Sequence, residues 1–491
     1  MTENIGDWLK RRSGAQGDEL GRIVRCAAAL FFLFLSYYLV KPLRNSQFLN
    51  EFDPLFMPWI YLVVSVTSML VTKVFQWCSL RFTRKQVVAG TFLWAMLCKL
   101  FFLVTLPQGG QRITALFYLW ASVYFLLLVP TLWGCLNERF RPDQCQRCFP
   151  FIALGSTVGG IAGSSVAQGL SSWGTRTLLW SIGSLLLSLA LLWPELSYPV
   201  QMSESKSVQP GPARSVPRYG WLGDTFLRAI GVMVLTLAIY STAADFITQR
   251  RLDAILGREA YQSELSSMWP DGYAEMNDLR KLASGERGPA LEKLAQRQHL
   301  PAAELKQAYE RFREHRERRS REVFANIFYY QGIVGVLLLG VFCRPFLRFF
   351  GLKAALVVLP TFALCVLPTL LTPLDLLSIQ LILIFSGSLN YSFNNATKEI
   401  LYSATDRASL LQAKPVIEGP LMRLGDVIFS TESILVAGAV TTFGWSPEWV
   451  ERLMVAPCFI AVSVWWILVR QAGGAYQKHS LASTCASDTS Q

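Results

Sequence analysis

Charged residues are scarce in this chain, and their scarcity excludes an ordinary soluble protein. Only 16% of the 491 residues are Asp, Glu, Lys or Arg, whereas 52% are apolar. A soluble chain of this length would carry roughly a quarter charged residues and would fold into several domains with polar surfaces. The apolar residues here fall in blocks close to the ~20 residues that cross a bilayer as a helix. The chain is therefore predicted to be an all-α membrane protein.

Histidine and phosphate-binding motifs are missing where an enzyme would need them. His299, His315 and His479 are the only histidines and all lie outside the apolar blocks, so none is available there for metal binding or general base chemistry. No GxxxxGK[ST] loop occurs, which leaves direct ATP hydrolysis without its usual motif. We therefore expect a protein that is not an enzyme and that carries no cofactor and no metal.

Disulfides and a cleavable leader are not indicated either. The ten cysteines are scattered, and most lie in or beside apolar blocks, where cysteine behaves as a small buried hydrophobe. Cys145 and Cys148 form one CxxC, but a zinc site of this type needs a second pair. The first ~20 residues are polar and lack a small-residue cleavage site, so the first apolar block is predicted to remain as a membrane helix.

The net charge of +12 does not form a basic face for nucleic acid. Most Lys and Arg residues lie in short connectors between apolar blocks, and these connectors alternate with connectors that carry almost none. This alternation is the positive-inside pattern, and it places both termini in the cytoplasm. We predict a multi-pass protein of the bacterial inner membrane whose partners are lipid and a small solute, with no nucleic acid.

About twelve predicted spans divide into two sets of six. A linker at 197–221, rich in Ser, Pro and Gly, separates an N-terminal bundle (23–196) from a C-terminal bundle (222–247 and 323–470), and 1–22 and 471–491 are cytoplasmic ends. This is the layout of the major facilitator fold. The spans are 23–41, 54–78, 87–106, 112–136, 148–170, 176–196, 222–247, 323–349, 351–371, 374–395, 414–443 and 447–469.

A charged segment at 248–322 interrupts the second set, and the alternation places it outside the cytoplasm. Residues 301–321 are rich in Ala, Glu, Lys and Arg, which favours a helix running toward the next span. Residues 249–268 are predicted to form another helix that ends near Pro270. The mixed charges indicate a solvated helical hairpin, which is either a spacer or a lid or docking site for a protein partner.

Charged side chains inside a span are costly, so each is a candidate functional residue. Lys41 and Arg44 lie three residues apart near the end of the first span, on one helix face with Tyr37. Pro42 between them is predicted to disturb the helix. Arg suits bidentate contacts to phosphate and Lys acts as a point charge, although both side chains could instead snorkel to the interface.

Polar residues at the spans of the second half extend the candidate site. The candidate substrate-binding residues are Lys41, Arg44, Asn390, Asn394, Lys398, Lys414 and Arg423. The candidate gating or proton-coupling carboxylates are Glu138, Asp245, Glu399 and Asp426. Arg423 and Asp426 also stand one turn apart and could form an internal ion pair. Several cations around a central cavity favour an anionic solute. Gly155, Gly159 and Gly163 predict close helix packing rather than ligand contact.

These residues resemble motifs of the bacterial and plastid ATP/ADP translocases. The first-helix Lys-x-Leu-Arg motif of that family is similar to 41–44, its Trp-Gly-x-x-Asn-Glu stretch and glycine-rich helix to 133–155, and its later motifs to 397–399, Lys414 and 423–425. A carboxylate at the end of the family's seventh helix falls on Asp245. The resemblance covers both halves but not 248–322. It implies a nucleotide exchanger of major-facilitator-like fold.

Two positions depart from that family. Asn45 stands where aspartate usually follows the first-helix arginine, and Asp426 stands where lysine follows Arg-Leu-Gly. An anion in place of a cation favours a less charged solute or a proton-coupled mechanism. The sequence thus predicts a secondary transporter that moves nucleotides or a related organic anion by alternating access. The alternatives are a major-facilitator-type transporter of a non-nucleotide solute, and a non-transporting sensor or scaffold that uses the 248–322 insertion.

Overall fold

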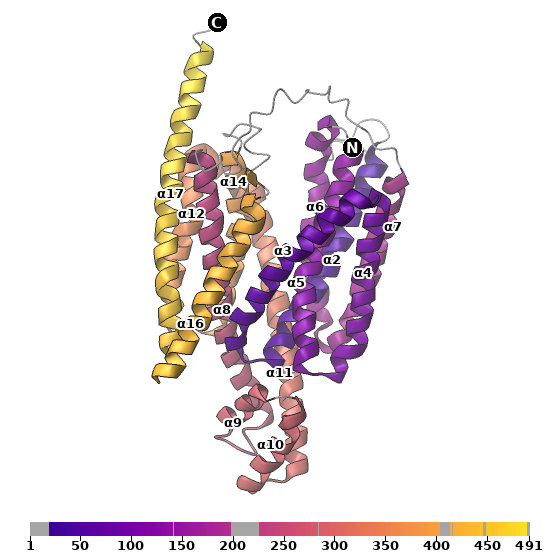
Figure 1. Cartoon of the computed structure of the whole chain (residues 1–491), viewed down its shortest axis with the longest axis vertical. Helices are drawn as coiled ribbons and strands as arrows, with labels where there is room; N and C mark the ends of the chain where they lie inside the picture. The colour runs from indigo at the N-terminus through magenta and orange to yellow at the C-terminus, as the bar shows by residue number, and fades with distance from the viewer. Residues whose placement is uncertain are drawn as a thin grey trace, which may run out of the picture. The chain divides into compact units, whose positions relative to one another are not determined.

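The computed structural model is helical throughout the part of the chain that it describes, which is residues 19–140, 142–197, 225–282, 284–402, 413–414, 416–444 and 448–488 (Figure 1). Ten stretches of this part are long and apolar enough to cross a membrane, by length and composition. Large apolar side chains face outward on them, such as Leu80, which is 89% exposed, as expected of side chains that meet lipid. The prediction of an all-α membrane protein is confirmed.

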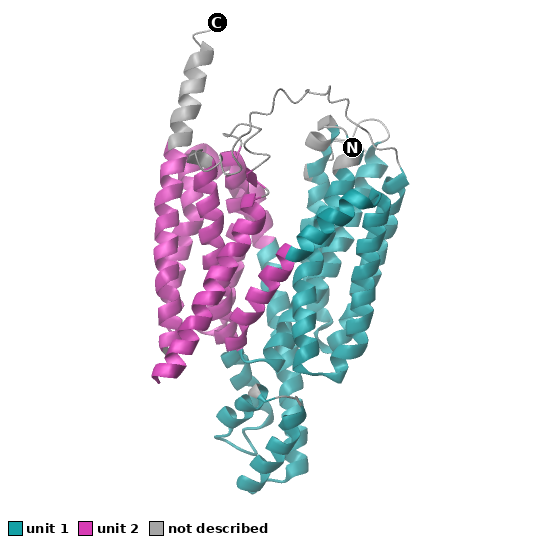
Figure 2. Ribbon diagram, in the orientation of Figure 1, with its two compact units in different colours: residues 1–53, 70–208, 253–332 teal, residues 54–69, 209–252, 333–491 magenta. Residues whose placement is uncertain are grey.

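Each of the twelve predicted spans overlaps a helix. The stretch Ala302–Thr369 holds two of them, and α6 (Pro142–Gly169) holds the predicted span 148–170. The chain divides into two compact units, which are described separately (Figure 2). Unit 1 comprises residues 1–53, 70–208 and 253–332, and unit 2 comprises residues 54–69, 209–252 and 333–491. The segment predicted as a separate insertion therefore groups mostly with unit 1.

Unit 1 is organised around α2 (Glu19–Glu51), which packs against α5, α6 and α7. Glycines of α6 permit the closest of these contacts: a Cβ on Gly155 would lie 2.1 Å from the carbonyl oxygen of Ala27, and one on Gly159 would lie 2.2 Å from that of Phe31. The prediction that these glycines serve packing is confirmed. The remaining elements are α4 (Arg84–Thr105), η2 (Leu106–Gln108), α5 (Gln111–Arg139), η3 (Ser171–Arg176) and α7 (Thr177–Ser197).

Helix α2 is longer than the predicted span 23–41 and contains Pro42 without a break. The disturbance predicted at Pro42 is therefore not a break in the helix. A proline removes one backbone hydrogen bond, but in a membrane helix neighbouring groups satisfy the freed carbonyl and the helix can continue. As a consequence Lys41 and Arg44 lie in the interior of one continuous helix.

Unit 2 contains helices that follow the linker, together with the first part of α3 (Met57–Arg81) and the turn η1 (Pro54–Phe56). Three π-helical segments interrupt its regular helices, and each carries glycine, asparagine or proline. The remaining elements are η6 (Leu338–Phe342), α12 (Cys343–Thr369), α13 (Leu376–Ser388), η7 (Leu389–Asn394), α14 (Asn395–Tyr402), η8 (Ile417–Leu421), α16 (Met422–Phe443) and α17 (Glu448–Asp488).

The helices predicted at 249–268 and 301–321 are present as the outer parts of longer helices. They belong to α8 (Thr225–Glu264) and α11 (Ala302–Leu337), and α9 (Tyr273–Asp278), η5 (Leu279–Lys281) and α10 (Ser284–Arg297) lie between them. Tyr261, Trp269, Leu305 and Phe312 share an apolar core in this region. The description as a solvated hairpin is therefore corrected: α9, α10 and the outer parts of α8 and α11 form a small helical subdomain with its own core.

Candidate functional site

A cluster of two cations and three aromatic rings lies along α2 in unit 1, and we call it the α2 patch: Tyr37, Tyr38, Lys41, Arg44 and Phe328. The Lys41 ammonium is 3.8 Å from the centroid of the Phe328 ring on α11, and 5.5 and 5.9 Å from those of Tyr38 and Tyr37. A cation within about 6 Å of an aromatic face is attracted by the ring quadrupole. These contacts hold the ammonium within the helix bundle.

Arg44 lies one turn further along α2, against α5. Its guanidinium carbon is 4.7 Å from the ring centroid of Tyr118, and its Nη1 donates to the Ser122 hydroxyl at 3.1 Å. Asn45 accepts two bonds from it, from Nε at 3.0 Å and from Nη2 at 2.8 Å. The residue that departs from the translocase motif thus orients the arginine through an amide oxygen. Neutral groups therefore hold the Arg44 guanidinium in place.

Asp245 of α8 lies in a polar cluster within unit 2. Its Oδ2 accepts a hydrogen bond of 2.7 Å from the Tyr61 hydroxyl of α3 and one of 2.5 Å from Gln249 Nε2, one turn along α8. Gln249 is buried and also lies 3.3 Å from the Tyr61 hydroxyl. Two neutral donors therefore stabilise this carboxylate.

Asp426 of α16 contacts α8 and α3 on the faces that also carry Asp245 and Tyr61. Its Oδ1 accepts a 2.7 Å hydrogen bond from the Thr242 hydroxyl, and Ser65 also bonds to it. Its Oδ2 accepts from Arg423 Nη1 at 3.1 Å. The internal ion pair that the sequence allowed between Arg423 and Asp426 is present. Arg423 therefore has a carboxylate partner within its own helix.

The two candidate lysines beside α14 and η8 are paired with carboxylates as well. Lys398 lies 2.8 Å from Glu418, and Lys414 lies 2.8 Å from Glu399. These pairs link α14 to the segment around η8 within unit 2. Each of the three candidate cations of unit 2 (Lys398, Lys414 and Arg423) is thus paired with a carboxylate. Unit 2 therefore does not present them as unpaired positive charges.

Asn390 and Asn394 both lie in η7, where the helix is wider than the predicted α-helix. Asn394 is buried, and among the described residues its side-chain nitrogen has no hydrogen-bond partner, which leaves a donor inside unit 2. The side chain of Glu138 lies outside the described residues. Among the described residues, no group of His, Cys, Asp or Glu could hold a metal ion.

Further charged residues lie inside the predicted spans, beyond those that the sequence singled out. Glu432 lies in α16, and among the described residues its buried Oε1 has no hydrogen-bond partner. Lys99 lies in α4 and is completely buried in unit 1. The rule that an ionisable residue in a span marks a functional position would have found both.

Lys99 contacts three neighbouring helices. Its Nζ donates to the hydroxyls of Ser36 on α2, at 2.6 Å, and Ser181 on α7, at 2.7 Å. The ring of Tyr124 on α5 lies below it, with the centroid 5.1 Å from Nζ. The Tyr124 hydroxyl is buried and has no hydrogen-bond partner in the part of the chain that the structure describes.

Buried arginines join the helical subdomain to the end of α2 within unit 1. Arg280 lies 3.0 Å from Asp253 and donates to the Leu49 carbonyl at 2.8 Å, and Arg316 also pairs with Asp253. Burial lowers the pKa of the Arg280 guanidinium, but the Asp253 carboxylate offsets this and leaves that pKa above its ordinary value. Glu51, at the end of α2, is paired in the same way with two arginines of the subdomain.

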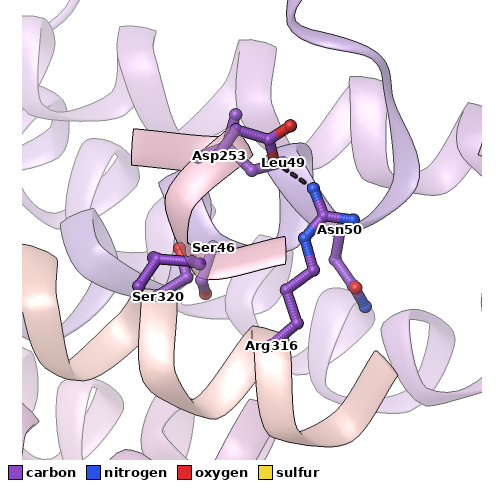
Figure 3. Close-up of a pocket in the computed structure, with 7 residues that line it drawn as sticks. Ser46, Leu49, Asn50, Asp253, Arg316 and Ser320 are labelled. Carbon is purple, nitrogen blue, oxygen red and sulfur yellow. Dashed lines mark hydrogen bonds and ion pairs between the residues drawn. The ribbon is translucent and has the colours of Figure 1, made fainter. Parts of the chain in front are cut away.

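A hollow at this contact is lined by residues of α2, α8 and α11 (Figure 3). Arg316 extends across it toward Asp253, beside Asn50, while Ser46 and Ser320 face each other on the other side. The hollow leaves no space for a water molecule. We therefore interpret it as part of a packed polar contact and not as a ligand site.

Comparison with solved structures shows which fold this arrangement represents. The nucleoside transporter NupG is similar with a TM-score of 0.55 at 14% sequence identity, over 91% of this chain and 98% of that one. A bacterial homologue of the human lysosomal transporter Spinster, in an inward-facing and unoccupied conformation, is similar with a TM-score of 0.52 at 10% identity, over 94% of this chain and 99% of that one.

Comparison with protein-family models gives no match, and comparison with curated proteins gives none. Sequence identities this low establish a shared fold and not a shared substrate. The predicted major facilitator architecture is nevertheless confirmed over nearly the whole length of both solved transporters. The chain is a multi-pass, all-α membrane protein with the fold of the major facilitator transporters.

Proposed function

We propose that this protein is a secondary transporter that moves a nucleotide, a nucleoside or a related organic anion across the bacterial inner membrane by alternating access. The fold supports transport, because two helical units around a midplane site are the usual machinery of such proteins. One of the similar structures is a nucleoside transporter. We expect both termini on the cytoplasmic side and exchange of the kind that the ATP/ADP translocases perform.

The α2 patch is the observation that carries this proposal. Lys41 lies among three aromatic rings, and Arg44 one turn away lies over a fourth. Aromatic faces stack on nucleobases with little sequence preference, and Lys and Arg bind phosphate oxygens. The cations of α2, together with aromatic rings of α2, α5 and α11, therefore match the two halves of a nucleotide.

A second candidate function is transport of a non-nucleotide solute, and the ion pairs of unit 2 favour it. Arg423, Lys398 and Lys414 are each neutralised by a carboxylate. A solute with several phosphates would have to displace those carboxylates before it could use these cations. A solute with a single negative charge would need only the α2 patch.

The test is uptake of labelled nucleosides, nucleoside mono-, di- and triphosphates and inorganic phosphate into intact cells that express the protein, with unlabelled competitors. Saturable uptake of a nucleoside or nucleotide, released again by unlabelled solute outside, would support the proposal. Uptake inhibited only by other anions would support the second candidate. A correctly inserted protein that transports none of them would favour another solute and make the helical subdomain the next target.

Substitutions then test the α2 patch itself. We expect Lys41→Ala and Arg44→Ala each to reduce nucleotide uptake by about 10–100-fold, because each removes a charge-assisted contact worth about 1.5–3 kcal/mol. Lys73→Ala and Arg112→Ala are matched controls, since both residues are exposed in the same unit. They should transport like the wild type. Wild-type uptake by both patch variants, at equal membrane content, would reject the assignment.

A further inference from the structure

The buried amine of Lys99 has no role in the function proposed above. It is 0% exposed in α4, within a predicted span. In the part of the chain that the structure describes, it contacts two hydroxyls and one aromatic ring but forms no ion pair with a carboxylate. An ammonium buried in a membrane protein without a counter-charge is expensive.

The hydrogen bonds around Lys99 can be counted. The Ser36 hydroxyl donates to the Ser181 carbonyl at 2.8 Å, and the Ser181 hydroxyl donates to the Ser36 carbonyl at 2.7 Å. The two hydroxyl oxygens also lie 2.9 Å apart. Whether each hydroxyl proton goes to a carbonyl or to the other hydroxyl, both protons are used, so the two oxygens accept from Lys99. A charged ammonium has three N–H donors and would leave one without an oxygen acceptor. A neutral amine has two N–H groups, and both are satisfied here.

The side chains that face Lys99 determine how its amine can gain or lose a proton. α2 and α7 present Ser36 and Ser181, and the titratable group presented by α5 is the phenol of Tyr124. Tyr124 lies with its ring centroid 6.2 Å from that of Tyr37, which belongs to the α2 patch, and it interacts electrostatically with Arg44. Tyr124 and Tyr37 thus connect the Lys99 amine to the proposed substrate contacts.

We propose that Lys99 is a proton-binding site: a neutral amine in the conformation of this structure that takes up a proton during the transport cycle and couples solute movement to the proton gradient. The inference rests on the proposed transport function for its coupling role, and it makes the proton gradient, in place of solute exchange, the driving force. A purely structural role would be the linking of α2, α4 and α7 by hydrogen bonds. Glutamine at this position donates the same two bonds but binds no proton, so Lys99→Gln separates the two roles.

The first experiment needs no substrate. The melting temperature of the purified protein is measured between pH 6 and pH 9 for the wild type, for Lys99→Gln and for Lys73→Gln. The lysine is protonated in the unfolded chain throughout this range, and it is neutral in the folded chain. Folding therefore releases a proton, and the wild type should gain roughly 1–2 °C per pH unit relative to Lys99→Gln.

Lys73→Gln is the control, because it changes an exposed lysine of the same unit and should keep the wild-type pH dependence. Parallel curves for the wild type and Lys99→Gln would overturn the proposal. If Lys99→Gln does not fold, Lys99→Met provides a variant that lacks both the proton site and the two hydrogen bonds. The same difference in slope is expected from it.

The second experiment measures coupling in proteoliposomes with the solute identified by uptake. The ratio of accumulation with an imposed pH gradient to accumulation without one should exceed one in the wild type and in Lys73→Gln, and should fall to one in Lys99→Gln. A gradient response in Lys99→Gln equal to that of the wild type would refute the coupling role. Absence of transport by the wild type would instead refute the proposed function, and the melting experiment would still decide the state of Lys99.

Discussion

At the residue scale, one buried carboxylate supplies the counter-charge for two buried arginines. Asp253 pairs with both Arg280 and Arg316, and all three side chains are buried. Asparagine has nearly the same shape but no charge, so Asp253→Asn leaves two guanidinium groups buried without a counter-charge. Removal of one partner from a buried pair costs about 3–5 kcal/mol. We expect a loss of this size in the free energy of unfolding, measured as a lower melting temperature.

Glu259→Gln is the matched control for that substitution. Glu259 lies on the same helix, and its pair with Arg319 is 3.1 Å long, but the two side chains are 41% and 38% exposed. Exposed ion pairs contribute about 0–1 kcal/mol, so the control should melt close to the wild type. Equal losses in the two variants would contradict the view that burial makes the Asp253 pairs important.

The charge pattern predicted some of these residues but not their partners. The pair between Arg423 and Asp426 was recognisable because both residues lie one turn apart on one helix. The partner of Lys398, in contrast, comes from a different segment around Glu418, and spacing gives no information on such contacts. For the same reason the sequence did not reveal the carboxylate partners of Lys398 and Lys414.

At the scale of elements, the contact between α2 and α6 is the most sensitive to side-chain size. A Cβ on Gly159 would lie 2.2 Å from the backbone oxygen of Phe31, which cannot move without the helix. We therefore expect Gly159→Leu to force α2 and α6 apart and to lower the free energy of unfolding by about 2–3 kcal/mol. Thermal melting of the purified variant, with gel filtration to report aggregation, measures this effect.

Gly169→Ala provides the comparison on the same helix. Nothing lies within 4 Å of a Cβ placed on Gly169, so this substitution should leave the melting temperature within a few degrees of the wild type. A stable, monodisperse Gly159→Leu protein would show that the two helices are not locked by backbone contact. The four-residue glycine spacing predicted this contact because small residues at that period form one face of a helix.

Helix boundaries were less predictable than helix packing. The apolar pattern ends near residue 41, yet α2 continues to Glu51, because contacts from the helical subdomain compensate the polar residues of its last turns. Arg280 satisfies the Leu49 carbonyl and Arg287 lies 2.7 Å from Glu51. These partners are more than 200 positions away in sequence, so no local pattern could reveal them.

At the scale of the whole molecule, the order of the membrane-spanning helices among the described residues followed from hydropathy, since each span must satisfy its backbone polar groups within itself. The helical subdomain is different. Its charged composition indicated a solvated segment, whereas its arginines are partly buried against carboxylates of α2 and α8. A charged residue is therefore predicted to be exposed only where no residue of opposite charge can be buried together with it.

The role of the subdomain is tested by its removal. Glu264 at the end of α8 lies 3.9 Å from Arg311 of α11, so residues 266–309 can be replaced by a short Gly/Ser linker that joins the two helices. Asp253 keeps Arg316 and Glu51 keeps Arg313 as partners, and the helices should therefore remain folded, apart from the last turn of α2, which loses Arg280 and Arg287. We expect the shortened protein to retain measurable solute uptake in cells, because the α2 patch is intact. A correctly inserted shortened protein without any uptake, beside an active full chain, would show that the subdomain is part of the transport machinery.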